Sequence, residues 1–543
     1  MITKTQNAKT KIALSVLSGI LLAVIQPPTS LFPIAYMSLI PLFFALEKNG
    51  FRHNFIMGFI TGVAAHLGQI YWVVIAMNRY GGIDIYTSVF IMLLLVFYLA
   101  IYIACFAALS VYLEDSLFVP VYISAPFIWV LLEYIRGIFF TGFPWSFLAH
   151  SQHNVLSLIQ IVSVTGTYFL SFLIVAVNCI IYQILNALYE RKRKKGSWVL
   201  VFQGSKDNTG AEKMLNAIAP RRINACFVVY VSVVLGLLGI SFCYGYARLQ
   251  STHTGDLKAA IIQGNIRQDV KWDEAFKIKT INTYLQKTGE FGRNSDIVVW
   301  PETAMPFVFD DAPHINKFIK EAPTLLNTNL LFGTVSKDKF GRYRNSAYFY
   351  QKDGQLAGTY SKVHLVPFGE YTPLISYLPF LSWLTAAGGN FVPGESHSPI
   401  NTSLGKIGIL ICYEGTFPSI TIETVRRGAQ VLFNLTKYAW YDKTSAPDQH
   451  LVFYVFRAIE SDRYVLRAAN TGISTIIDPR GRINGQTGLF EEGAYVGTFS
   501  LKNEKTAYVA YGDCFVLFSF LFLLAACASV SYTHLTLPTI YSV

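Results

Sequence analysis

The chain has 543 residues, of which 52% are hydrophobic, 15% aromatic and only 14% charged, whereas an ordinary soluble domain is about 25% charged. This composition excludes a single soluble globule, and it also excludes intrinsic disorder and a small disulfide scaffold. In a soluble protein, a formal charge of +11 indicates binding to nucleic acid. In a membrane protein, the same excess can come from the Lys and Arg of the loops that stay in the cytoplasm.

Long apolar stretches dominate the N-terminal half. Seven of them precede residue 250, at 11–28, 32–46, 54–76, 86–113, 119–140, 155–188 and 224–247, and an eighth lies at 506–530. A membrane span needs about 17 to 25 mostly apolar residues. The sequence therefore predicts about eight transmembrane helices, seven in a domain over 1–250 and one over 505–530. The stretch 32–46 is short, so an interfacial or re-entrant helix stays open there.

Charge is concentrated between these two membrane regions. Residues 254–504 carry 26 of the 44 Lys and Arg and 24 of the 33 Asp and Glu, so this block has a net charge of +2 and the rest has +9. We interpret 251–504 as a soluble domain within a membrane protein. Lys and Arg in the connections, including the run 191–195, place both termini in the cytoplasm and the soluble block on the opposite face. Residues 531–543 are polar and β-branched, and we expect them to be a non-native tail.

The soluble block alternates strand-like and helix-like segments. It opens with the strand pattern of 256–266, followed by a helical stretch near 272–291 and the apolar runs 296–300, 406–411 and 429–436. Short, continuous apolar strands separated by helical stretches predict an α/β layered domain. Ligands of such folds gather at the carboxyl ends of the strands.

One cysteine stands apart from the other six. Cys412 is the only cysteine in the soluble block, whereas the rest lie in apolar stretches. An unpaired thiol outside the cytoplasm is a liability unless it is buried or used. Cys412 on its own is therefore either a nucleophile or a buried hydrophobe. It precedes a predicted helix at 416–428, whose N-terminal dipole is expected to lower the pKa of the thiol.

Acidic and basic residues accompany this thiol at the ends of the predicted strands. Glu302 follows the strand 296–300, and Lys362 and Glu370 lie eight residues apart between the two strands. A carboxylate that takes the thiol proton and an ammonium that stabilises an oxyanion suit acyl transfer. Each residue also has a structural interpretation, as a helix-cap charge, a loop lysine or a salt-bridge partner.

The motifs WPET (300–303), YSKVHLVPFGEY (360–371) and ICYE (411–414) resemble the Glu-Lys-Cys triad of the nitrilase, or carbon–nitrogen hydrolase, superfamily. With the predicted spans, the chain is similar to the membrane-embedded N-acyltransferases of that superfamily, which act last in bacterial lipoprotein maturation. The segments 129–145 and 457–472 carry the same likeness. The resemblance implies an extracytoplasmic nitrilase-like domain folded as an αββα sandwich.

The resemblance also implies roles for individual residues. Glu302 is expected to be the general base, Lys362 the oxyanion stabiliser and Cys412 the nucleophile. The supporting residues implied by the same likeness are Glu370, Trp272, Tyr413 and Glu414. The implied reaction is ping-pong: Cys412 takes an acyl chain from a phospholipid, typically phosphatidylethanolamine, and the free amine of a diacylglyceryl-cysteine on an apolipoprotein accepts it. A monomer in the bacterial inner membrane, with its catalytic domain in the periplasm, is expected.

One loop departs from the family's pattern. The segment NLTKYAWYD (434–442) places Lys437 and Tyr438 where the family more often has small polar residues, which puts the substrate contacts of that loop in doubt. Two other functions remain open: a membrane-tethered amidase that hydrolyses a lipid amide or ester, and a catalytically inactive lipid-binding or transport protein. The sequence has no metal-ligand spacing, P-loop or aromatic-interleaved basic patch, so we expect no cofactor, metal or nucleic acid.

Overall fold

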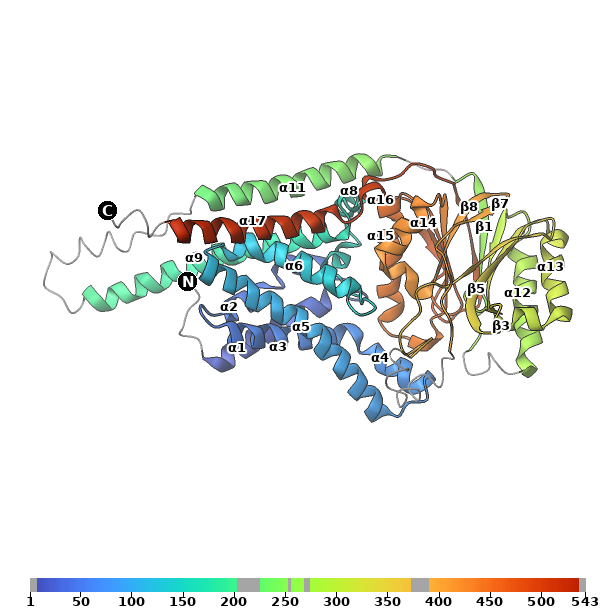
Figure 1. Cartoon of the computed structure of the whole chain (residues 1–543), viewed down its shortest axis with the longest axis horizontal. Helices are drawn as coiled ribbons and strands as arrows, with labels where there is room; N and C mark the ends of the chain where they lie inside the picture. Colours follow the sequence, from blue (N-terminus) through green and yellow to red (C-terminus); the bar gives the residue numbers. More distant parts are fainter. Residues whose placement is uncertain (1–6, 203–224, 252–254, 268–273, 373–389, 537–543) are drawn as a thin grey trace.

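The computed structural model describes residues 7–202, 225–251, 255–267, 274–372 and 390–536. Helices form one end of the molecule, and two sheets with their covering helices form the other (Figure 1). The described N-terminal part consists of helices α1 (Ala8–Val24), η1 (Phe32–Met37), α2 (Ile40–Ala45), α3 (Phe51–Ile70), α4 (Trp72–Ile75), η2 (Ala76–Tyr80), α5 (Ile85–Leu117), α6 (Val121–Ile138), η3 (Leu148–Gln152), α7 (Leu156–Ile159), α8 (Val162–Thr165), α9 (Thr167–Phe202) and α11 (Ala225–Leu249).

Several of these helices can cross a membrane. In the described part of the chain, four are long and apolar enough: α5, α6, α9 as far as Lys192, and α11. The pair Phe51–Ile70 and Trp72–Tyr80, bent by 48°, makes a fifth if it counts as one span. The structure thus confirms a helical membrane domain with several spans.

Two predicted spans differ in detail from the sequence-based expectation. The stretch 32–46 is a short 3₁₀ helix followed by the short helix α2, not one continuous helix. The stretch 155–188 is also broken, because α7 and α8 precede Gly166, whose φ of +73° lies in the left-handed region, and the long helix α9 begins only at Thr167.

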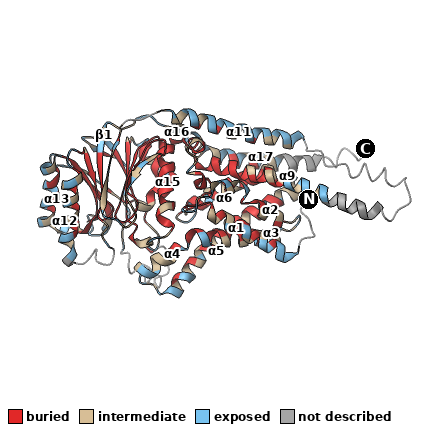
Figure 2. Cartoon of the chain, turned by 180° about the vertical axis from the view of Figure 1, so that it is seen from behind, coloured by how far each residue is buried: buried red, intermediate tan, exposed pale blue. Residues whose placement is uncertain are grey.

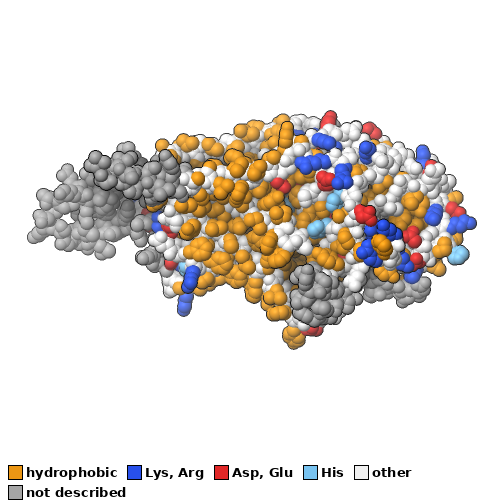
Figure 3. All heavy atoms as spheres, in the orientation of Figure 1, with side chains coloured by type: hydrophobic (Ala, Val, Ile, Leu, Met, Phe, Trp, Pro, Cys, Tyr) orange, Lys and Arg blue, Asp and Glu red, His pale blue; other side chains and the backbone are white. Residues whose placement is uncertain are grey.

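The surface of the molecule has an apolar part and a charged part, which correspond to the helices and to the sheets. Hydrophobic side chains gather over the helical part, whereas charged side chains gather over the sheets (Figure 3). On α11, large apolar residues such as Val229, Leu235 and Ile240 are exposed. An exposed apolar face of this extent on a long helix indicates contact with lipid.

Two sheets form the other end of the molecule. The first has the order β13-β1-β2-β4-β5-β6, with β3 paired to β4; the second has the order β12-β11-β10-β9-β8-β7. The strands are β1 (Leu257–Gln263), β2 (Ile297–Val299), β3 (Met305–Val308), β4 (Asn329–Lys337), β5 (Tyr343–Tyr350), β6 (Leu356–Ser361), β7 (Ile400–Thr402), β8 (Gly405–Ile411), β9 (Val431–Thr436), β10 (Val465–Ala469), β11 (Thr475–Ile477), β12 (Ile483–Gln486) and β13 (Gly493–Phe499). The four apolar runs predicted as strands are β1, β2, β8 and β9.

The two sheets and the helices that cover them form four layers, because the side chains of each strand point alternately to its two faces. In β2, Ile297 and Val299 face the core between the two sheets, whereas Val298 faces the outer core beneath α12 (Glu274–Phe291) and α13 (Pro313–Leu326). On the other side, α14 (Pro418–Arg426) and α15 (Ala446–Ser461) cover the second sheet, and buried residues fill both layers (Figure 2). This arrangement confirms the αββα sandwich.

Helices α16 (Ala507–Tyr511) and α17 (Cys514–Thr536) then return the chain along the membrane helices (Figure 1). Residues 531–536 of the expected non-native tail continue α17, and residues 537–543 lie outside the described residues.

Helix α15 joins the second sheet to the membrane helices. Gln449 lies at this junction, where its Oε1 accepts hydrogen bonds from the indole nitrogens of Trp72 at 3.2 Å and Trp145 at 2.7 Å. Its Nε2 donates to the carbonyl of Pro27 at 3.3 Å. One amide therefore connects three segments of the membrane part to the second sheet.

Candidate active site

Cys412 directly follows the carboxyl end of β8 and packs against the core between the two sheets. Its φ of +52° lies in the left-handed region, which a residue with a Cβ adopts only under constraint. The hydroxyl of Tyr454, on α15, donates to the carbonyl of Cys412 at 2.6 Å. Gly415 permits this approach, because a Cβ there would lie 2.2 Å from the Tyr454 ring.

The environment of the thiol differs from the sequence-based expectation. Burial, with the Glu302 carboxylate acting in the same direction, raises the pKa of Cys412 to about 12. The sequence predicted a lowered pKa for this thiol, whereas burial raises it. Cys412 begins the short 3₁₀ helix η6 (Cys412–Thr416), and α14 starts only at Pro418. The opposing influences on the thiol come from the Lys362 ammonium and the Thr436 hydroxyl.

Glu302 reaches the same region from the first sheet. It follows β2 and is only 8% exposed, and the next residue, Thr303, has a φ of +45°. The side-chain amide of Asn345, on β5, donates to Glu302 Oε1 at 2.8 Å. The backbone passes so close to β4 that a Cβ at Gly333 would lie 2.7 Å from the Cα of Glu302.

Lys362 and Glu370 form a buried ion pair beside Glu302. Lys362 Nζ lies 2.7 Å from Glu370 Oε2, and Asn345 Nδ2 also donates to Glu370 Oε1 at 3.0 Å. Burial alone would lower the pKa of Lys362, but Glu370, followed by Cys412 and Glu302, raises it above its usual value. Burial alone would likewise raise the pKa of Glu370, but Lys362 lowers it. The structure thus brings Glu302, Lys362, Glu370 and Cys412 together.

The remaining predicted site residues lie differently. Tyr413 is next to the thiol, and its hydroxyl donates to the Gly142 carbonyl in the membrane part at 3.3 Å. Glu414 turns into the fold: its carboxylate accepts hydrogen bonds from the hydroxyl of Tyr360 and from the backbone amides of Ile411, Val363 and His364. Burial raises the pKa of Glu414 to about 7. Trp272 lies outside the described residues.

Three residues near the site have no role in the sequence-based interpretation. Asn345 holds both carboxylates, Tyr454 holds the Cys412 backbone, and Thr436 lies beside the thiol. The buried part of strand 343–350 carries a polar Asn among aromatic residues such as Tyr348 and Phe349, and this was the available signal for the first of them. The pairing of β8 with β9 brings Thr436 to the thiol, and the packing of α15 on the second sheet brings Tyr454; the sequence gives neither.

Family models match both parts of the chain. The model described as carbon–nitrogen hydrolase matches residues 258–508, and the model described as apolipoprotein N-acyltransferase N-terminal domain matches residues 18–180. A curated apolipoprotein N-acyltransferase of Geobacter metallireducens is 38% identical over 508 residues, which cover 92% of each chain. The chain belongs to the apolipoprotein N-acyltransferase family. Another relative of that name, from Rickettsia typhi, is 28% identical and covers 95% of this chain and 97% of its own.

Among solved structures, the chain is similar to a carbon–nitrogen hydrolase from Helicobacter pylori G27 and to Nit3 of Saccharomyces cerevisiae. The first is 17% identical with a TM-score of 0.36, and covers 45% of this chain and 89% of its own. The second is 19% identical with a TM-score of 0.37, and covers 48% and 97%. Membership of the apolipoprotein N-acyltransferase family makes the chain an acyltransferase of the nitrilase superfamily, associated with a membrane.

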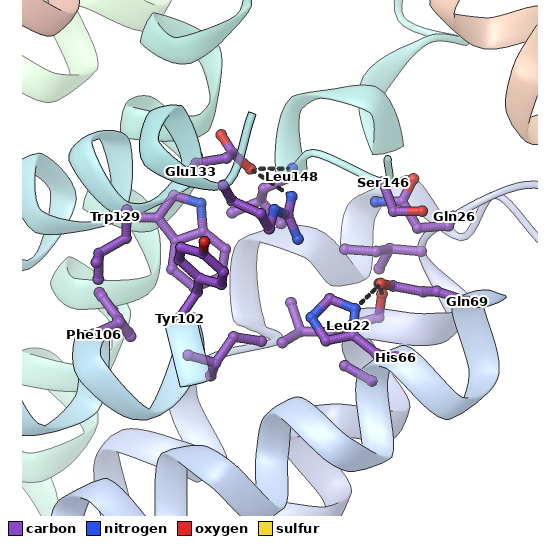
Figure 4. Close-up of a pocket in the computed structure, with 15 residues that line it drawn as sticks. Leu22, Gln26, His66, Gln69, Tyr102, Phe106, Trp129, Glu133, Ser146 and Leu148 are labelled. Atoms are coloured by element: carbon purple, nitrogen blue, oxygen red, sulfur yellow. Dashed lines mark hydrogen bonds and ion pairs between the residues drawn. The ribbon is translucent and has the colours of Figure 1, made fainter. Parts of the chain in front are cut away.

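A separate cavity, lined by both apolar and polar residues, lies within the membrane helices of this family member (Figure 4). It has a volume of about 40 Å³, enough for a few water molecules, and is lined by residues that include His66, Tyr102, Trp129, Glu133 and Arg136. Glu133 Oε1 accepts from the backbone amide of Leu148 at 2.8 Å and lies 3.9 Å from Arg136 Nη2. None of the Glu302, Lys362 and Cys412 side chains lines this cavity.

Proposed function

We propose that this enzyme N-acylates the N-terminal S-diacylglyceryl-cysteine of apolipoproteins, using a phospholipid acyl chain carried as a thioester on Cys412. The observation that carries this proposal is the position of the thiol. Cys412 lies where Glu302 and Lys362 from one sheet act on it electrostatically, and its neighbour Tyr413 contacts the membrane part at Gly142. Both substrates are anchored in a membrane, so a site at this junction can reach both.

In the first half-reaction, Glu302 takes the proton of the Cys412 thiol while the sulfur attacks the ester carbonyl of the phospholipid. The Lys362 ammonium stabilises the oxyanion that forms. As the tetrahedral intermediate collapses, the carbon–oxygen bond of the ester breaks, and Glu302 returns its proton to the leaving lysophospholipid oxygen. The raised pKa of Cys412 supports proton transfer coupled to attack, because little free thiolate exists before substrate binds.

In the second half-reaction, the free α-amine of the lipidated cysteine attacks the thioester. A carbon–nitrogen bond forms and the carbon–sulfur bond breaks. Glu302 accepts the amine proton and delivers it to the departing Cys412 sulfur, which restores the starting state. A dry, membrane-facing site protects the thioester from water until the amine arrives.

Supporting roles follow from the contacts. Glu370 orients Lys362 through the 2.7 Å ion pair and keeps it charged. Tyr413 positions the nucleophile against the membrane part, and Glu414 fixes the backbone around the strand ends. Trp272 is proposed as a substrate contact. The proposed domain limits are 1–250 for the N-terminal membrane domain, 251–504 for the catalytic domain and 505–530 for the last span.

The location and donor are part of the same proposal. The basic run 191–195 lies in α9, and α9 and α17 both end at the side of the helices away from the sheets (Figure 1). The positive-inside rule supports an inner-membrane protein with its sheets in the periplasm. Phosphatidylethanolamine is the proposed donor, and a monomer is the proposed active form.

Mass spectrometry of the Cys412 peptide tests this function. The purified full-length enzyme is incubated in vesicles that contain phosphatidylethanolamine, and then treated with a synthetic diacylglyceryl-cysteine peptide. We expect a fatty-acyl thioester on Cys412 that the peptide amine removes, with the acyl chain recovered as an amide on the peptide. Parallel vesicles of phosphatidylglycerol and phosphatidylcholine report the choice of donor.

Two variants act as controls. Cys412→Ala should form no adduct, whereas Cys243→Ala, which removes an exposed cysteine on α11, should behave like the wild-type enzyme. Free fatty acid without any acylated peptide would instead indicate the hydrolase. A wild-type enzyme that forms no adduct and no product would favour the inactive lipid-binding protein.

A further inference from the structure

The carboxylate of Glu414 connects the two strand ends that carry Lys362 and Cys412. Its Oε1 accepts a hydrogen bond from the backbone amide of Val363, the residue after Lys362, at 2.8 Å. Its Oε2 accepts one from the backbone amide of Ile411, the residue before Cys412, at 2.7 Å. The first amide follows β6 of one sheet and the second belongs to the last residue of β8 in the other sheet. A single side chain therefore fixes the backbone on both sides of the site.

Tyr360 holds this carboxylate from the first sheet. It lies on β6, is 4% exposed, and its hydroxyl donates to Glu414 Oε1 at 2.9 Å. The same hydroxyl oxygen lies 3.3 Å from Nδ1 of His397. A hydroxyl has one proton, which here is directed to the carboxylate, so the contact with the ring requires a proton on His397 Nδ1. His397, Tyr360 and Glu414 thus form a chain of hydrogen bonds that ends between Lys362 and Cys412.

The surroundings of the His397 ring support this position of the proton. The residue is half-buried in the segment before β7. Burial, followed by the Arg427 guanidinium, lowers the pKa of the ring, while Glu423 acts in the opposite direction. The ring is therefore neutral at neutral pH and carries one proton, which the contact with Tyr360 places on Nδ1.

Other contacts hold the segment that carries His397. Arg427, directly after α14, donates from Nη1 to the hydroxyl of Ser396 at 2.8 Å and to that of Ser398 at 3.0 Å. The backbone amide of Gly394 donates to the backbone carbonyl of Lys362 at 2.8 Å. None of these bonds involves the ring of His397, so removal of the ring should leave the segment in place.

We propose that His397 is a positioning residue for acyl transfer, which acts through Tyr360 and Glu414 on the backbone beside Lys362 and Cys412. The inference rests on the proposed function of Lys362 and Cys412, and it adds a residue that lies outside the sequence motifs of the site. A proton received from Nδ1 makes the Tyr360 hydroxyl a stronger donor to Glu414, because hydrogen bonds in a chain polarise one another. Loss of the ring should loosen both strand ends and slow the reaction without weakening substrate binding.

A double-mutant cycle on the full-length enzyme tests this chain of hydrogen bonds. His397→Leu and Tyr360→Phe are made singly and together. Two rates are measured: kcat for acyl transfer from vesicles that contain phosphatidylethanolamine to a diacylglyceryl-cysteine peptide, and the rate at which iodoacetamide alkylates Cys412. We expect His397→Leu to lower both rates about three- to tenfold, as for the loss of one hydrogen bond, with KM unchanged. The double variant should be as fast as Tyr360→Phe alone, because His397 acts only through that hydroxyl.

Two polar variants separate positioning from packing. His397→Asn keeps an N–H donor near the position of Nδ1 and should restore both rates. His397→Gln carries its amide one bond further from the backbone, away from the Tyr360 hydroxyl, and should not restore them. His314→Leu, at an exposed position on α13, is the matched control and should change neither rate.

Wild-type rates in His397→Leu would overturn the proposal, and so would effects of His397→Leu and Tyr360→Phe that multiply in the double variant. If His397→Leu does not fold, the Asn and Gln variants decide, and equal rates in these two would overturn the proposal. Alkylation needs neither phospholipid nor peptide, so it tests the chain of hydrogen bonds independently of acyl transfer. A wild-type enzyme that forms no acyl adduct would overturn the proposed function alone.

Discussion

The Tyr454 hydroxyl holds the backbone carbonyl of Cys412 at 2.6 Å, across the boundary between α15 and the end of β8. Cys412 has a positive φ, which costs energy for any residue with a Cβ. The hydrogen bond therefore helps to keep the nucleophile in a conformation that the chain would otherwise leave. It also links the thiol to the helix that contacts the membrane part.

Tyr454→Phe removes this hydrogen bond and keeps the ring. We expect the free energy of unfolding to fall by about 1 kcal/mol and kcat to fall by about tenfold or more, because a displaced nucleophile loses its attack geometry. Thermal unfolding and single-turnover acylation measure the two effects. Tyr343→Phe, at an exposed position, serves as the matched control. An unchanged kcat with a lower melting temperature would limit Tyr454 to a structural role.

Asn345 is expected to set the geometry of both carboxylates. Asn345→Ala removes the amide that donates to Glu302 and Glu370, and kcat/KM should fall by about 10²-fold. Asn345→Asp should be worse, because a third carboxylate in the same buried space repels the other two. Steady-state kinetics of both variants test this order. Equal activity in Asn345→Asp and wild type would contradict it, and Asn401→Ala, at an exposed position on β7, provides the control.

Glu370→Gln should destabilise the enzyme in a pH-dependent way. Breaking a buried ion pair costs about 3 to 5 kcal/mol. The pKa of Glu370 is lowered in the fold, so its contribution is present above its ordinary value of 4.5 and is lost as the pH falls through the lower folded value. The pKa of Lys362 is raised, so its contribution is present below 10.5 and is lost as the pH rises through the folded value.

The difference in melting temperature between wild type and Glu370→Gln should thus stay constant between about pH 6 and 9 and narrow in acid. Tryptophan fluorescence during heating follows this difference. A gap that widens below pH 4.5 would show that the pair is not ionised in the folded enzyme.

Glu133→Leu tests the cavity within the membrane helices. The substitution leaves the Arg136 guanidinium without its carboxylate and the Leu148 amide without its acceptor, and should lower stability by about 3 kcal/mol or more. Glu133→Gln keeps an acceptor for the Leu148 amide and should lose less. Thermal unfolding in detergent gives the comparison. Equal melting temperatures for the two variants would mean that packing, not the polar contacts, decides stability there.

Local patterns predicted the ends of β2 and β8 because alternation and apolar runs depend on neighbouring residues. Glu302 and Cys412 follow directly from those runs. Asn345 could not be predicted in this way, because it reaches the site through the pairing of β5 with β6. There its backbone carbonyl accepts a hydrogen bond from the backbone amide of Lys362 at 2.8 Å. Such a register joins residues that the sequence keeps apart.

Two predictions from the sequence differ from the structure, and each difference has a physical cause. The helix expected at 416–428 forms as α14, Pro418–Arg426, but the thiol is buried, and burial raises its pKa where the sequence predicted a lowered one. Hydropathy reports how apolar a segment is and not whether it runs straight. The apolar stretch 155–188 therefore concealed the break at Gly166.

Gln449 links the sheets and the membrane helices through the hydrogen bonds of one side chain. Trp72 and Trp145 both donate to its one side-chain oxygen, and its nitrogen donates to Pro27. A fragment of residues 251–504 made without the helices would expose this amide and the apolar face of α15 around it, on the same helix that holds the Cys412 carbonyl. Removal of the membrane helices would therefore disturb the position of Cys412. A soluble fragment made in this way should lose catalytic activity.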